Sequence, residues 1–135
     1  MFQKLIKLLM QIADGRSRGS ERVGSYTISD FLKLVTTMKN LGTTKFQGEP
    51  DPIKANEWLE MIEENFKATL CPLEYKKAIA AYYLEKEALA WWKSTERQLE
   101  GSEITWDLFK SEFLRKYFPQ EARDRLERKF LTLYQ

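Results

Sequence analysis

The sequence predicts an all-α fold, a small bundle of about five helices. Large apolar side chains recur at helical spacing through the second half of the chain, and prolines and glycines separate these stripes. Evidence for strands is thin, because the chain has only two valines, Val23 and Val35, and no alternating segment flanked by turns. With 135 residues, of which 43% are hydrophobic, the chain can bury one packed core.

The first residues of the chain predict an amphipathic helix over residues 2–13, since their apolar side chains share one broad arc. The arc consists of Phe2, Leu5, Ile6, Leu8, Leu9, Ile12 and Ala13. Such a helix fits self-association, a membrane surface, packing on the chain's own domain, or an arbitrary extension. Its polar face carries only two lysines, which favours the last two interpretations.

A polar linker and a shorter helix come next. Residues 14–27 are rich in glycine, serine and arginine and predict a flexible linker. Residues 28–44 predict a short helix over Asp30–Asn40, with Ser29 as its N-cap and an end before Gly42, followed by an entry loop. The compact domain is expected to start near residues 43–46 and to occupy residues 45–135.

That domain opens with two helices. Asp51 supplies an N-cap and Pro52 the first position of the first helix. Its apolar stripe consists of Ala55, Trp58, Leu59, Ile62 and Phe66. Pro72 and Leu73 open the second helix, whose inward-facing residues are predicted to be Ala78, Ile79 and Tyr82.

Three more helices complete the predicted bundle. After a break near residues 85–86, a helix over residues 87–99 is closed by Gly101 and Ser102. Thr105 caps the next helix, Pro119 ends it, and a last amphipathic helix covers residues 121–134. The apolar positions of these helices are Ala88, Trp91, Trp92 and Leu99, then Trp106, Phe109, Phe113 and Tyr117, then Ala122, Leu126, Phe130 and Leu133.

Two features of the composition argue against an enzyme. The chain has no histidine, which excludes a Ser-His-Asp or Cys-His relay and any zinc site built on imidazole. A single cysteine, Cys71, excludes an intrachain disulfide and is interpreted as a buried or half-buried apolar residue. Glu60, Glu63 and Glu64 are predicted to lie on a solvated helix face. We therefore expect no enzymatic activity, cofactor, metal or small-molecule substrate.

The charge is almost balanced but unevenly distributed. The net charge of +2 excludes a simple polycation, yet residues 1–50 hold eight basic and four acidic residues, against 14 and 16 in the remainder. Arg16, Arg18 and Arg22 are candidate contacts to RNA phosphates, although three arginines near two acids are more often a solvated linker.

No apolar run reaches the roughly 18–20 residues that a membrane span needs. The N-terminal apolar stretch is interrupted by lysine and glutamine, and no signal-peptide cleavage site follows it. The expected location is therefore intracellular, in the cytoplasm, and neither secretion nor membrane association is expected.

Several short motifs follow one another in a specific order after residue 45. They are Phe46-Gln47-Gly48, Asp51-Pro52, the stripe from Ala55 to Phe66, Ala80-Ala81-Tyr82-Tyr83-Leu84, Ala88-Leu89-Ala90-Trp91-Trp92, Thr105-Trp106-x-x-Phe109-x-x-x-Phe113, Tyr117-Phe118-Pro119 and Arg125-x-x-x-Lys129-Phe130-x-x-Leu133-x-Gln135. In this order, over residues 45–135, they resemble the gag domain of gypsy-type LTR retrotransposons. The upstream run Ile28-Ser29-Asp30-Phe31-Leu32 resembles the lead-in of plant members.

The residues that carry this resemblance are interpreted as fold-making, because large aromatics at helical spacing bury much apolar surface. They are Phe46, Gly48, Trp58, Phe66, Ala88, Trp91, Trp92, Trp106, Phe109, Phe113 and Tyr117. Gly48 is expected to permit a turn into the first helix. Neighbours on a helix point about 100° apart, so one of Trp91 and Trp92 is expected at an edge of the core.

The resemblance implies a capsid-type structural protein with the fold of the N-terminal lobe of retroviral capsid. Such domains self-associate into shells that package the element's RNA, which makes further copies of the chain the expected partners. This chain departs from the family at Lys86, where members commonly have glycine, and it ends before a second lobe and a zinc knuckle, as a truncated polyprotein would. Two alternatives stay open: an RNA-binding protein acting through its basic N-terminal segment, and a domesticated adaptor whose groove holds a partner peptide.

Overall fold

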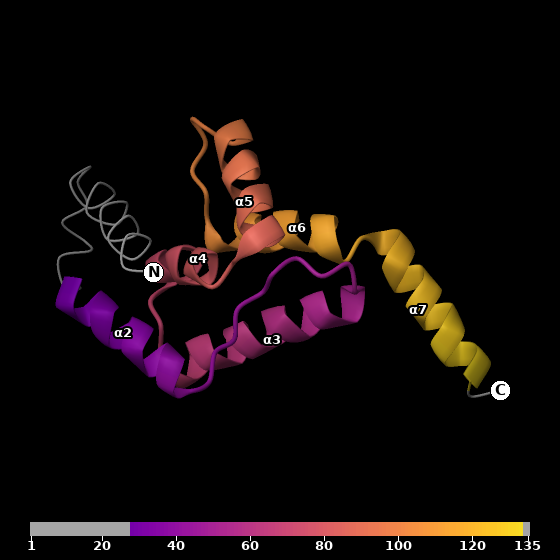
Figure 1. Cartoon of the computed structure of the whole chain (residues 1–135), viewed down its shortest axis with the longest axis horizontal. Helices are drawn as coiled ribbons and strands as arrows, with labels where there is room; N and C mark the ends of the chain where they lie inside the picture. The colour runs from indigo at the N-terminus through magenta and orange to yellow at the C-terminus, as the bar shows by residue number, and fades with distance from the viewer. Residues whose placement is uncertain (1–27, 134–135) are drawn as a thin grey trace.

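The computed structural model describes residues 28–133, and over this range the chain folds into six helices (Figure 1). They are α2 (Ile28–Asn40), α3 (Pro52–Ala68), α4 (Leu73–Tyr82), α5 (Lys86–Gln98), α6 (Trp106–Tyr117) and α7 (Gln120–Leu133). Within residues 28–133 the β-pairing is limited to one isolated parallel bridge, between Phe46 and Leu84. The all-α prediction is confirmed for these residues, whereas the helix predicted over residues 2–13 and the linker over residues 14–27 lie outside them.

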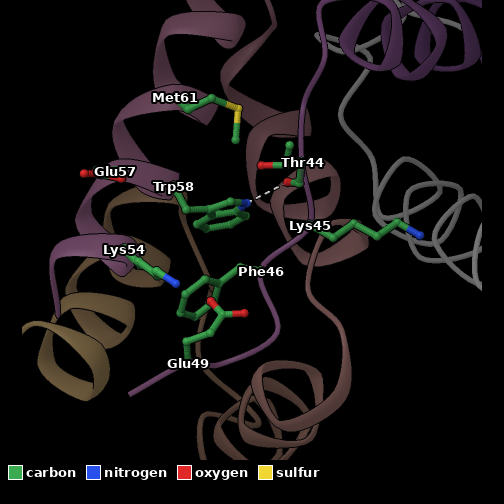
Figure 2. Close-up of a pocket in the computed structure, with 8 residues that line it drawn as sticks. All are labelled: Thr44, Lys45, Phe46, Glu49, Lys54, Glu57, Trp58 and Met61. Carbon is green, nitrogen blue, oxygen red and sulfur yellow. Dashed lines mark hydrogen bonds between the residues drawn. The ribbon is translucent and has the colours of Figure 1, made fainter. Parts of the chain in front are cut away.

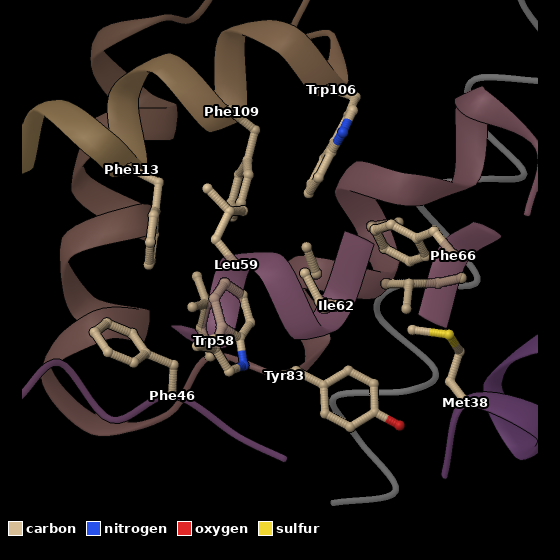
Figure 3. Close-up of a cluster of buried hydrophobic side chains, with 14 of the residues drawn as sticks. Met38, Phe46, Trp58, Leu59, Ile62, Phe66, Tyr83, Trp106, Phe109 and Phe113 are labelled. Atoms are coloured by element: carbon tan, nitrogen blue, oxygen red, sulfur yellow. The ribbon is translucent and has the colours of Figure 1, made fainter. Parts of the chain in front are cut away.

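Helix α6 is central to the bundle, because it packs on both α3 and α4. Its Phe109 and Phe113 are fully buried, and Trp92 of α5 meets Phe109 edge to face with the ring centroids 4.8 Å apart. In Figure 3 the aromatic side chains of α6 point toward Leu59 and Ile62 of α3. Edge-to-face packing of this kind adds to the free energy gained by burying the rings.

Eight of the eleven fold-making residues of the sequence analysis are part of this core. Phe46, Trp58, Phe66, Ala88, Trp92, Trp106, Phe109 and Phe113 are all buried. Trp91, Tyr117 and Gly48 are half-buried. Trp91 and Trp92 thus divide between the edge and the interior of the core, as their separation around the helix requires.

Side-chain caps fix the beginnings of two helices at the predicted residues. An Asp51 Oδ1 accepts a hydrogen bond from the Ile53 amide at 3.0 Å, and Pro52 occupies the first position of α3. The Thr105 hydroxyl accepts one from the Leu108 amide at 3.1 Å, at the start of α6. Each cap satisfies an amide that the helix itself leaves unpaired.

Helix α2 is part of the same core rather than a separate lead-in. Its Phe31 and Met38 are fully buried, and Phe31 meets Tyr75 of α4 edge to face with the centroids 5.4 Å apart. The packed unit therefore begins at α2, earlier than the start near residues 43–46 expected from the sequence. The helix also begins at Ile28, so Ser29 lies in its first turn and is not its N-cap.

Two further expectations are corrected by the packing. Tyr82 was expected to face inward, but it is only half-buried. Tyr83, the residue after α4, is instead 4% exposed, because the chain turns into the core there. Glu63 was expected on a solvated face together with Glu60 and Glu64. Its carboxylate instead lies 2.9 Å from the Lys110 ammonium, where it joins α3 to α6.

An extended entry segment, residues 43–49, joins α2 to α3 and is held from two sides. The Phe46 amide donates to the Tyr83 carbonyl and the Phe46 carbonyl accepts from the Glu85 amide, each at 2.9 Å. On the other side, the Trp58 indole N–H donates to the Thr44 carbonyl at 2.8 Å. The segment is therefore clamped between α3 and the α4–α5 turn.

Glycine is required at position 48, where the entry segment passes close to the first turn of α5. Gly48 has a φ of +96°, and a Cβ built on it would lie 2.9 Å from the Ala88 amide nitrogen and 3.2 Å from the Tyr117 hydroxyl. At the neighbouring turn, Lys86 has a φ of +51°, so the left-handed conformation is kept where the gag resemblance implies glycine.

We predict that Gly48→Ala destabilises the fold by about 1–3 kcal/mol more than Gly101→Ala does, because the added methyl group must displace backbone at position 48. Gly101 is a matched control, since it has a φ of +91° and nothing within 4 Å of the place that a Cβ would occupy. Urea unfolding followed by tryptophan fluorescence measures both variants. Equal losses of unfolding free energy would contradict the close approach to Ala88.

Candidate interaction surfaces

The first candidate surface is a hollow of about 370 Å³ between the entry segment and α3 (Figure 2). It is lined by Thr44, Lys45, Phe46, Glu49, Lys54, Glu57, Trp58 and Met61. Trp58 and Phe46 form its floor and are both nearly inaccessible, and the accessible lining is divided about equally between polar and apolar atoms. Two lysines and two glutamates balance the charge around it, which suits a mixed polar and apolar peptide better than a polyanion.

Ring contacts and an ion pair hold the entry segment in place beside this hollow. The rings of Phe46 and Trp58 lie 5.6 Å apart, and Phe46 also meets Phe113 and Tyr117 of α6. Lys45 adds an ion pair of 2.9 Å to Glu85, with both side chains about one-third exposed. These contacts fix the wall of the hollow without supplying any reactive group.

The second candidate surface is the apolar face of α7. Ala122 is the one buried residue of this helix, and Arg123 lies over the Phe118 ring at 5.2 Å. Beyond that point the helix projects from the end of α6 (Figure 1). Phe130, Leu131 and Leu133 are 59%, 61% and 76% exposed. Leu126, Glu127, Phe130 and Leu131 line a surface hollow of about 480 Å³.

The apolar stripe of α7 has the character of a contact surface, because most of it is exposed. The stripe predicted from the sequence does form a helix, but the helix buries a residue only in its first turn. Exposed aliphatic and aromatic side chains on one helix face are the usual mark of a contact surface. The sequence could not show this, because an amphipathic stripe looks the same whether its own core or a second molecule covers it.

Cys71 lies in the turn between α3 and α4 and is 8% exposed. Burial raises the pKa of its thiol from the ordinary 9.0 to about 12, while nearby Lys76 lowers it and Glu74 raises it. A thiol with so high a pKa is protonated at neutral pH and is a poor nucleophile. The interpretation of Cys71 as a small buried apolar residue agrees with this environment.

The remaining titratable groups offer no reactive constellation in the described part of the chain. Burial raises the pKa of the Tyr117 hydroxyl, and the nearby carboxylates of Glu87 and Glu49 raise it further. Between residues 28 and 133, no three cysteine, aspartate or glutamate side chains gather as metal ligands would. Arg16, Arg18 and Arg22 lie outside the described residues.

None of the six described helices combines the length and the apolar character that crossing a membrane requires. The family described as "Retrotransposon-derived protein PEG10, N-terminal capsid-like domain" matches residues 40–118, more than half of the chain. The match runs from the end of α2 to just beyond α6 and leaves α7 outside it. No curated protein and no solved structure matches the chain significantly.

We predict that the stability of the protein falls above pH 9 partly through Cys71. In the unfolded chain the thiol loses its proton near pH 9, whereas in the folded chain it keeps the proton up to about pH 12. Since the unfolded state then binds fewer protons, the free energy of unfolding decreases as the pH rises through this interval. The stabilising contribution is complete below pH 9.

Cys71→Ala tests this assignment, because alanine leaves the same site without a titrating group. The difference in unfolding free energy between wild type and Cys71→Ala should shrink by about 1 kcal/mol between pH 8 and pH 10. Urea unfolding at both pH values measures it, and other titrating groups cancel in the difference. A difference that is the same at both pH values would show that the thiol is not protected.

Proposed function

The chain belongs to the family of the retrotransposon-derived PEG10 N-terminal capsid-like domain, a capsid-type structural domain, and we propose that it self-associates into shells that package retrotransposon RNA. The observation that carries the self-association is the exposed apolar face of α7, on which Phe130 and Leu133 are both more than half exposed. Covering these side chains with a second copy removes apolar surface from water, which favours association.

The contacts of such an assembly are individually weak. A single fourteen-residue helix offers much less than the roughly 1,200 Å² of total area that a stable interface buries. Shell formation then depends on several weak contacts made at once, because each contact raises the effective concentration for the next. Assembly would therefore be steep in protein concentration.

The finer parts of the proposal rest on the sequence. The order of motifs over residues 45–135, together with Ile28-Ser29-Asp30-Phe31-Leu32, supports an origin in a gypsy-type, plant-like LTR retrotransposon. Arg16, Arg18 and Arg22 are the proposed phosphate contacts to RNA. We also propose a cytoplasmic location. We further propose that the protein has no enzymatic activity, which the lack of histidine and the buried, protonated Cys71 thiol support.

A domesticated adaptor is the second candidate function, and the hollow beside the entry segment favours it. The rigid floor formed by Phe46 and Trp58 and the balanced charges of the rim suit a short peptide. In that case Lys54 and Glu57, both on α3 at the rim of the hollow, would set which peptides bind.

We predict that the weight-average mass of the protein rises with concentration, and that the double variant Phe130→Ser, Leu133→Ser weakens this association at least about tenfold. Sedimentation equilibrium over a wide concentration range gives the association constant. Circular dichroism checks that the variant keeps its helices.

The matched control is Leu41→Ser, since Leu41 is a large apolar residue that is 47% exposed and directly follows α2, whose end lies far from α7 in Figure 1. It should associate as the wild type does. A wild type that stays monomeric at every concentration, or an equal loss of association in the control, would refute self-association through α7.

A further inference from the structure

Leu70, in the turn between α3 and α4, combines two unfavourable features. It has a φ of +52°, the left-handed conformation that glycine adopts most readily, and its side chain is 88% exposed. Nothing that the described residues contribute explains a leucine there rather than glycine or asparagine.

The hydrogen bonds of the turn show why this position is normally a glycine. The Cys71 amide donates to the Phe66 carbonyl at 2.9 Å, and the Leu70 amide donates to the Lys67 carbonyl at 3.1 Å. These two bonds define a Schellman motif at the end of α3, with Leu70 at its left-handed position. A leucine costs conformational free energy at this position. This cost indicates that the exposed side chain makes a contact that offsets it.

The surface beside Leu70 is shaped to receive apolar groups. A hollow of about 370 Å³ lies between the turn and α2, and its lining consists of Asp30, Lys33, Leu34, Thr37, Thr69, Leu70 and Pro72. The next helix begins with Leu73, which is 65% exposed. The turn thus presents two exposed leucines beside a shallow apolar recess.

We propose that residues 2–13 of the same chain dock on this surface, with their apolar arc against Leu34, Leu70 and Leu73. The sequence predicts an amphipathic helix there, whose arc includes Leu5, Leu9 and Ile12.

The connection between the two parts of the chain makes this docking geometrically direct. Residues 14–27 join the docking segment to Ile28, the first residue of α2, and Asp30 and Lys33 in the first turns of α2 already line the hollow. A flexible linker of this length has a root-mean-square reach of roughly 20 Å. Tethering of this kind gives an effective concentration on the order of millimolar.

Other occupants are less well matched to the surface. A second copy would need a total buried area of roughly 1,200 Å² or more, which two leucines and a small recess do not supply without a tether. A nucleic acid would need a basic rim, but Asp30 and Lys33 place one charge of each sign beside the hollow.

Hydrogen exchange on the full chain, read by mass spectrometry, tests the docking. In the wild type, the amides of residues 2–13 should exchange at least about tenfold more slowly than those of residues 14–27, because docking would protect only the docked segment. This protection should not change with protein concentration, since the contact is within one chain.

Leu70→Gly is the decisive variant, because glycine relieves the left-handed strain while it removes the side chain. It should leave the exchange of α3 and α6 unchanged and raise the exchange rates of residues 2–13 at least about fivefold. Leu70→Gly with Leu73→Ser should abolish their protection. The double variant Leu131→Ser, Leu133→Ser on α7 is the control, with side chains of similar exposure, and should have no effect on residues 2–13.

Three outcomes would overturn the proposal. They are residues 2–13 that exchange as fast as the linker in the wild type, protection that Leu70→Gly leaves intact, and protection that increases with protein concentration. The last would assign the surface to a second copy. The mass measurements on the α7 variants are independent of all three results, so the failure of either proposal can be recognised separately.

Discussion

The two backbone hydrogen bonds of Phe46 are the interaction on which the rest of the fold depends. They join the entry segment to the residues on either side of Leu84, while the Phe46 ring packs against Trp58, Phe113 and Tyr117. One residue therefore connects α3, α6 and the α4–α5 turn. Gly48 and the left-handed Lys86 follow from this clamp, because the segment must pass close under α5. Without it, α2 would be attached to the bundle only through its own core contacts.

The groups of the protein that are available to bind a partner lie at its surface. The core is occupied by aromatic rings, the one thiol is buried and protonated at neutral pH, and the polar groups that join helices, such as Glu63 and Lys110, form paired contacts. Within residues 28–133, three surface features remain for function: the apolar face of α7, the turn at Leu70 and the hollow beside the entry segment. A capsid-type role suits such a molecule, because assembly uses surfaces that repeat from copy to copy rather than a reactive pocket.

Much of this fold could be predicted from the sequence, since helical spacing and caps are local signals. Asp51 and Thr105 cap helices where expected, and the pair Trp91 and Trp92 divides between edge and core. Long-range packing was less accessible. No local signal shows that Phe31 reaches Tyr75, that Glu63 finds Lys110, or that Tyr83 rather than Tyr82 turns inward. The surfaces were the hardest to predict, because the stripe of α7 and the leucine at position 70 acquire meaning only once their exposure is known.

The central claim, that the entry segment is a structural clamp, is tested most directly by native-state hydrogen exchange of two amides. The Phe46 and Glu85 amides should exchange only through global unfolding, with the same opening free energy as the slowest amides of α3 and α6. This free energy should fall with urea at the slope of global unfolding. Exchange of these two amides through a low-energy local opening, independent of urea, would contradict the account, because the segment would then be an attached loop.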